Sequence, residues 1–133
     1  MYDTIPGIDL PDHTKELDQA ESLIEKYKTE LKEYRPTIVQ DNKSYSNFHH
    51  KIVQVLEYIG DLSIPAFNLS NTLETEYFKR HKHSPELARK MWTQHYHRVH
   101  KPYNVLKNRC FTLLDKLEEE YFRLHNVLPP SDF

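Results

Sequence analysis

Histidines are the residues of this chain whose type and spacing first suggest chemistry, because neutral imidazole is a common metal ligand. Five of the nine histidines fall between residues 81 and 100, in close pairs such as His95-x-His97 and His97-x-x-His100. Two ligands on one helix must be three or four residues apart to share a face, and only His97 and His100 satisfy this. The Glu-x-x-His motifs of di-iron bundles are absent. The sequence therefore predicts no metal site and no cofactor.

A catalytic pair of arginine and histidine is a second possibility. The spacing of Arg89 and His95 is similar to the loose Arg-x(4–6)-His pattern of the small helical RNases known as HEPN domains. In that interpretation the two residues position and protonate phosphate groups at a dimer interface. Lys90 departs from the pattern, which usually has a small polar residue after the arginine. Because a chance match is expected in a segment this rich in arginine and histidine, we assign no family and rank an RNase third among the functions.

Other common catalytic groups are not indicated. Cys110, the single cysteine, falls on an apolar helical seam, where a buried and inert thiol is the ordinary state. Gly7 and Gly60 are the two glycines of the chain, and this scarcity disfavours glycine-rich phosphate-binding loops. The sequence thus favours a non-enzymatic protein.

Charge is strongly segregated along the chain, although the net charge is only −2. Residues 1–78 carry 14 acids and 7 bases, and residues 110–133 carry 5 acids and 2 bases. Residues 79–109, in contrast, carry nine bases and one acid, Glu86. On a helix these bases form a continuous basic surface away from the apolar side. The residues predicted to bind a partner there are Arg89, Lys90, His97, Arg98, Lys101 and Arg109.

Three interpretations of this basic surface follow from the sequence. It can be a solvated helix face, paired with the acidic first helix of the same or a neighbouring molecule. It can dock an acidic surface of another protein, or it can bind nucleic-acid phosphates. An isoelectric point of about 6.5 and the lack of a recognised reading motif count against nucleic acid. We therefore predict a non-enzymatic interaction protein (an adaptor, regulator or inhibitor) with an acidic protein partner, and nucleic-acid binding is the alternative.

The elements that must position these residues are helices. From about Thr14, apolar residues advance by alternating three and four positions until Pro36, which predicts a first helix with a heptad-type seam. A second helix is predicted to end just before Gly60, and a third to begin at Pro65. One bent helix over residues 44–81 is the alternative, and two helices are favoured.

The clearest helix start in the chain is Ser84-Pro85-Glu86, which combines a capping serine, a first-turn proline and an acid near the positive helix end. After it the three-four stepping continues through Pro102. We predict one long helix over about residues 85–125, kinked at Pro102 and about 60 Å long, with two helices meeting at Pro102 as the alternative. Because so long an apolar side exceeds what one short bundle covers, a homodimer is also expected.

Together these elements predict an all-α fold, a helical bundle of about four helices with a long, Pro-kinked C-terminal helix. The chain is expected to form a single helical domain over 1–133, with an irregular N-terminal arm at 1–11 and a C-terminal tail at 126–133. No apolar run approaches the ~20 residues that span a bilayer. The N-terminus also lacks the basic and apolar regions of a signal peptide. We expect no membrane partner and a cytoplasmic location.

Overall fold

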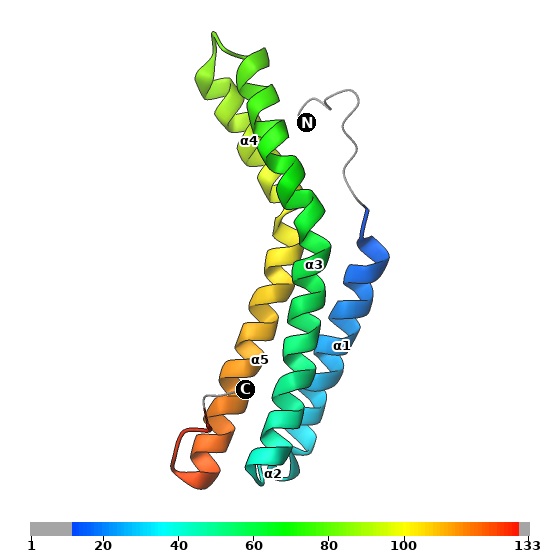
Figure 1. The fold of residues 1–133 in the computed structure, drawn as a ribbon, viewed down its shortest axis with the longest axis vertical. Helices are drawn as coiled ribbons and strands as arrows, with labels where there is room; N and C mark the ends of the chain where they lie inside the picture. The colour runs from blue at the N-terminus through cyan, green and yellow to red at the C-terminus, as the bar shows by residue number, and fades with distance from the viewer. Residues whose placement is uncertain (1–11, 131–133) are drawn as a thin grey trace.

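The computed structural model of the protein describes residues 12–130, except for the side chains of residues 69–74, 77, 95 and 98. The arm predicted at 1–11 and the last part of the tail, 131–133, lie outside the described residues. All regular secondary structure within 12–130 is α-helical, which confirms the all-α class. The helices are α1 (Thr14–Glu33), α2 (Arg35–Ile38), α3 (Asn42–Arg80), α4 (Pro85–Val99) and α5 (Lys101–His125) (Figure 1).

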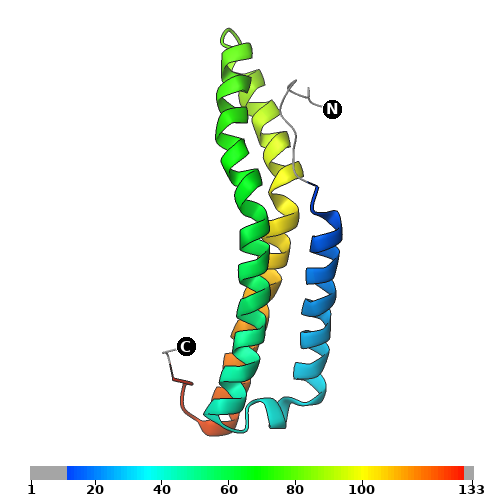
Figure 2. The same cartoon turned by 45° about the vertical axis from the view of Figure 1, so that its right-hand side comes forward.

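The helices form an elongated bundle whose two halves differ in composition (Figures 1 and 2). In one half α1, α3 and α5 pack against one another, and in the other half α3 packs against α4. α3 runs antiparallel to α4 and α5, whereas α1 and α5 run in the same direction. In both views α4 and the C-terminal half of α3 extend beyond the start of α1. The molecule is therefore a three-helix bundle with a two-helix extension.

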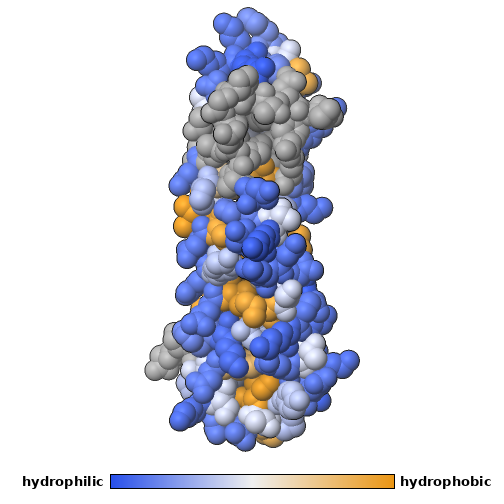
Figure 3. Space-filling view, turned by 90° about the vertical axis from the view of Figure 1, so that its right-hand side faces the viewer, coloured by the Kyte–Doolittle hydropathy of each residue, from blue (hydrophilic) through white to orange (hydrophobic). Residues whose placement is uncertain are grey.

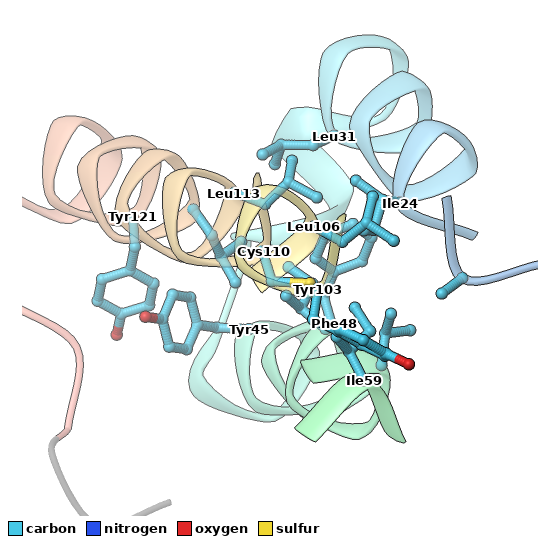
Figure 4. Close-up of a cluster of buried hydrophobic side chains, with 14 of the residues drawn as sticks. Ile24, Leu31, Tyr45, Phe48, Ile59, Tyr103, Leu106, Cys110, Leu113 and Tyr121 are labelled. Atoms are coloured by element: carbon cyan, nitrogen blue, oxygen red, sulfur yellow. The ribbon is translucent and has the colours of Figure 1, made fainter. Parts of the chain in front are cut away.

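The main core lies between α1, α3 and α5 and follows the apolar stepping of the sequence (Figure 4). Ile59, Cys110 and Leu117 have no exposed surface, and in the close-up Leu31 of α1 and Leu113 of α5 point toward one another. Burying side chains of this size contributes about 1.5–3 kcal/mol each, which outweighs weak helix propensity. Other buried members of the cluster are Ala20, Ile24, Val39, Tyr45, Phe48, Ile52, Val55, Ala66, Val99, Tyr103, Leu106 and Tyr121.

Helix α1 has the limits that its sequence predicts. Its N-cap residue is His13, whose side chain makes no capping hydrogen bond. Just before it, the Asp12 carboxylate accepts hydrogen bonds from the Thr14 amide at 3.1 Å and the Thr14 hydroxyl at 2.7 Å. The helix ends at Glu33, three residues before Pro36. Pro36 then lies in the first turn of the short helix α2, where its missing N–H costs no helical hydrogen bond.

Helix α3 corrects the prediction of two helices over residues 44–81. It is a single helix of 39 residues that contains both Gly60 and Pro65. Tertiary packing explains the continuity, because Ile59 and Ala66 on either side of these residues are both fully buried. Pro65 itself is exposed. The backbone carbonyl that its missing N–H leaves free can therefore be hydrated. Burial of the neighbouring residues in the core therefore outweighs the tendency of Gly60 and Pro65 to end a helix.

Helices α4 and α5 correct the prediction of one helix kinked at Pro102. Ser84 is the N-cap residue of α4 and Pro85 its first residue, as predicted, but α4 ends at Val99. α5 begins at Lys101 with Pro102 in its first turn. The missing N–H of Pro102 interrupts the hydrogen-bond ladder, and its ring restricts the residue before it. His100 keeps a right-handed helical conformation (φ −94°, ψ −29°), so the apolar phase continues across the break.

The described chain leaves helical structure after residue 125. α5 ends at His125, and Asn126 adopts a left-handed conformation with φ 58° that terminates the helix. Residues 127–130 have no regular structure. Among the helices of residues 12–130, none combines the length and the hydropathy that crossing a lipid bilayer requires.

The continuity of α3 leads to a stability prediction. We expect Pro65→Ala to raise the free energy of unfolding by about 2 kcal/mol, because it restores an interior helical hydrogen bond worth more than the chain entropy that proline removes. Pro102→Ala is the matched control, and it should change stability by less than about 1 kcal/mol because Pro102 occupies a first turn. Urea denaturation measures both. Equal effects of the two substitutions would contradict a continuous α3.

Candidate functional site

The two-helix extension carries a cluster of exposed cations that we call the basic hairpin. It comprises the end of α3, the turn at 81–84 and the first half of α4. Between residues 79 and 100 the only acid in the sequence is Glu86. The exposed cations of the basic hairpin are Lys79, Arg80, Lys82, Arg89 and Lys90.

The six residues predicted to bind a partner are distributed over α4 and α5. Arg89, Lys90 and His97 are exposed on α4, and Lys101 is exposed at the start of α5. The side chain of Arg98 lies outside the described residues, as does that of His95, the histidine of the RNase interpretation. The sixth residue, Arg109, lies further along α5.

Arg109 lies against α1 and is paired within the molecule. Its guanidinium forms an ion pair with Glu25 and has Nη1 3.9 Å from Oε1 of Glu21. Its side chain retains 31% of its exposure. The intramolecular pairing with the acidic first helix, one of the three interpretations of the basic surface, therefore occurs at Arg109.

A groove between α1 and the α4–α5 junction brings His97, Lys101 and Arg109 together. Its volume is about 510 Å³, and we call it the mixed groove because Asp18 and Glu21 of α1 line it opposite the cations. Figure 3 shows the side of the molecule that α1 covers, where hydrophilic residues predominate and hydrophobic residues form separate patches. The mixed groove thus divides the predicted site, since Arg89 and Lys90 do not line it.

A second groove, which sequence reasoning missed, lies between the C-terminal half of α1 and α5. Its volume is about 600 Å³. We call it the lysine groove, and its lining residues are Ile24, Lys28, Leu31, Lys32, Arg35, Arg109, Thr112, Leu113, Lys116 and Glu120. Four of these cations come from sequence segments with a net negative charge. Summing the charge over each segment therefore did not reveal them. The spacing of Lys28, Lys32 and Arg35 on one helical stripe was the signal that could have revealed them.

The lining of the lysine groove includes a buried carboxylate. Glu120 is 5% exposed, and Nη1 of Arg35 donates to both of its oxygens at 3.4 Å. Arg123, one turn further along α5, lies 3.4 Å from the same carboxylate. These cations compensate the cost of burying the charge. Nearby, the His125 imidazole contacts the Val39 carbonyl oxygen at 2.7 Å, so this end of α5 is fixed to the rest of the bundle.

The junction of α4 and α5 contains a buried histidine. His100 is 6% exposed, with its ring 4.9 Å from the Tyr96 ring and 6.1 Å from the Phe67 ring, centroid to centroid. Burial lowers the pKa of His100 below its usual value of 6.5, and the nearby charge of Lys107 lowers it further. The neutral imidazole is therefore the form that fits this packed position.

Two features of the described side chains bear on metal binding and on nucleophilic chemistry. No group of three histidine, cysteine or carboxylate side chains that could hold a metal ion occurs among the side chains that the structure describes. Cys110 is fully buried, and burial raises the pKa of its thiol to about 11. A thiol in that state is protonated at neutral pH and is a poor nucleophile.

Comparison with known proteins assigns no relative to the chain. No protein-family model matches it, and neither a curated protein nor a solved structure matches it at a significant level.

The burial of His100 leads to a prediction about pH. Its pKa is lower in the folded than in the unfolded state, so the unfolded chain binds more protons below about pH 6.5 and stability falls as the pH decreases through this range. We expect His100→Asn to reduce the loss of unfolding free energy between about pH 7.5 and pH 5, as measured by urea denaturation. The exposed His97→Asn is the control and should leave the loss unchanged. The same pH dependence in both variants would show that His100 does not cause it.

Proposed function

We propose that this chain is a non-enzymatic interaction protein and that its basic hairpin, together with His97 and Lys101, docks an acidic surface of a partner protein. The observation that best supports this proposal is the position of the cations relative to α1. Arg109 lies beside acidic α1 and is neutralised by it, whereas Arg89 and Lys90 lie on α4, in the extension beyond α1. Their charge is therefore available to another molecule.

Electrostatics favours a protruding site of this kind. Charges held on an exposed extension attract an oppositely charged partner and accelerate its encounter, with a strong dependence on salt. Four of the residues predicted to bind a partner are exposed, namely Arg89, Lys90, His97 and Lys101. Because they lie on helices, their backbone positions are set before a partner arrives, which reduces the backbone entropy lost on binding.

Charge reversal tests the proposal. We expect the double variant K90E/K101E to bind labelled poly-glutamate, a model acidic polypeptide, at least about ten-fold more weakly than the natural chain at low salt, as measured by fluorescence anisotropy. K15E/K26E is the matched control, because it makes the same change in net charge at exposed positions of α1. The control should lose less than about three-fold. Circular dichroism should show the same helix content in all three proteins.

Two outcomes would contradict a protein-docking role. Equal weakening in both double variants would mean that only net charge matters and that the basic surface is a solvated face. Preferential binding of random single- or double-stranded DNA or RNA over poly-glutamate, sensitive to K90E/K101E, would move nucleic-acid phosphate binding ahead of protein docking.

The homodimer expected from the sequence belongs to the same proposal. Large apolar side chains are exposed on α3 and α5, among them Phe67 at 63%, Phe111 at 50% and Phe122 at 46%. A second copy that covered them would remove apolar area from water at about 25 cal/mol per Å². We expect light scattering coupled to size-exclusion chromatography to give twice the 16.0 kDa mass of the chain. A mass of one chain at micromolar concentration would contradict the dimer.

A further inference from the structure

The register of α1 against α5 makes an unusual charge pattern in the lysine groove. Glu25 pairs with Arg109, and Arg35 pairs with Glu120. Lys32 follows Glu25 by seven residues, and Lys116 follows Arg109 by seven residues. Because the two helices run in the same direction, the two lysines stand at the same height, about 10 Å from the Glu25–Arg109 pair.

The groove therefore gathers three lysines between two pairs of opposite charge. Lys28, Lys32 and Lys116 all line this groove, and in the part of the chain that the structure describes none of them forms an ion pair. All three lysines are exposed, so water screens their charges in part, but their repulsion still opposes the packing of α1 on α5. An anion between the three lysines would remove that repulsion.

The lining of the groove restricts what the anion can be. The apolar residues of its floor are buried, because Ile24, Leu31 and Leu113 are each at most 5% exposed, so they offer little surface to an acyl chain. The volume of about 600 Å³ falls within the range typical of small-molecule sites. The three lysines supply the point charges that bind phosphate oxygens, and the two paired arginines mark the ends of the site.

We propose that the lysine groove binds a water-soluble small molecule that carries two or more phosphate groups. Lys28, Lys32 and Lys116 hold the phosphates, and Arg35 and Arg109 border the site while remaining paired with α1 and α5 carboxylates. A single phosphate of charge about −2 would leave part of the triple lysine charge uncompensated, which favours the higher phosphate number. The site is separate from the basic hairpin and does not depend on the function proposed for it.

Inorganic tripolyphosphate is the probe for this site. We expect it to raise the Tm of the natural chain above that measured in NaCl of equal ionic strength, because it binds the folded state selectively. In the variant K32M/K116M the Tm without anion should rise, since the repulsion is removed and the aliphatic length is kept. The same variant should bind tripolyphosphate at least about ten-fold more weakly by isothermal titration calorimetry.

Matched controls keep the result specific. K15M/K26M removes the same charge from exposed positions of α1 outside the groove and should keep the affinity of the natural chain. K90E/K101E should also keep it, so failure of this proposal and failure of the docking proposal are distinguishable. K116Q is a milder variant and should weaken tripolyphosphate binding about three-fold or more.

Several results would overturn the proposal. One is a Tm of the natural chain that tripolyphosphate raises no further than NaCl does. Another is an equal loss of affinity in K32M/K116M and K15M/K26M. Binding to phosphatidic-acid vesicles without binding to tripolyphosphate would assign the groove to lipid headgroups, and binding to poly-glutamate alone would assign it to an acidic protein segment.

Discussion

The difference in length between α1 and α3 determines the layout of this molecule. α1 has 20 residues and α3 has 39, so α1 can cover only part of the surface that α3 makes with α4 and α5. Where α1 is present, its carboxylates neutralise a cation of α5 and its apolar stripe completes a three-helix core. Where it is absent, two helices remain and their cations face solvent. The shorter length of α1 thus separates a half with a three-helix core from a half with exposed cations.

The sequence predicted those elements whose local signals and tertiary packing agree. The apolar stepping of α1 ends just before Pro36, and the Ser84-Pro85 start of α4 is where the helix begins. Pro65 was misleading, because a proline that would end an isolated helix is tolerated when the residues around it are buried in a core. Pro102 was misleading in the opposite sense, since a continuous apolar phase concealed a break at His100.

The two kinds of candidate site differ in how far sequence could reveal them. The basic hairpin lies within one segment, so counting charges along the chain located it. The lysine groove combines residues from α1 and from α5, about 80 positions apart, and four of its five cations come from segments whose net charge is negative. Only the packing of the two helices shows that Lys32 and Lys116 line one groove. A site made from two distant helix faces requires knowledge of their packing, which periodicity does not supply.

The same arrangement has a consequence for the order of folding. α3 and α4 meet across a turn of a few residues at 81–84, whereas the side-chain contacts that fix the first helix and its flanks to α5 join residues 84 to 90 positions apart. Closing short loops costs less chain entropy than closing long ones, and contacts at short sequence separation form sooner. We therefore expect the α3–α4 and α1–α3 hairpins to form early and the contact between α1 and α5 to form late. The charged tip of the molecule would then form before the acidic helix that comes first in the chain closes against α5.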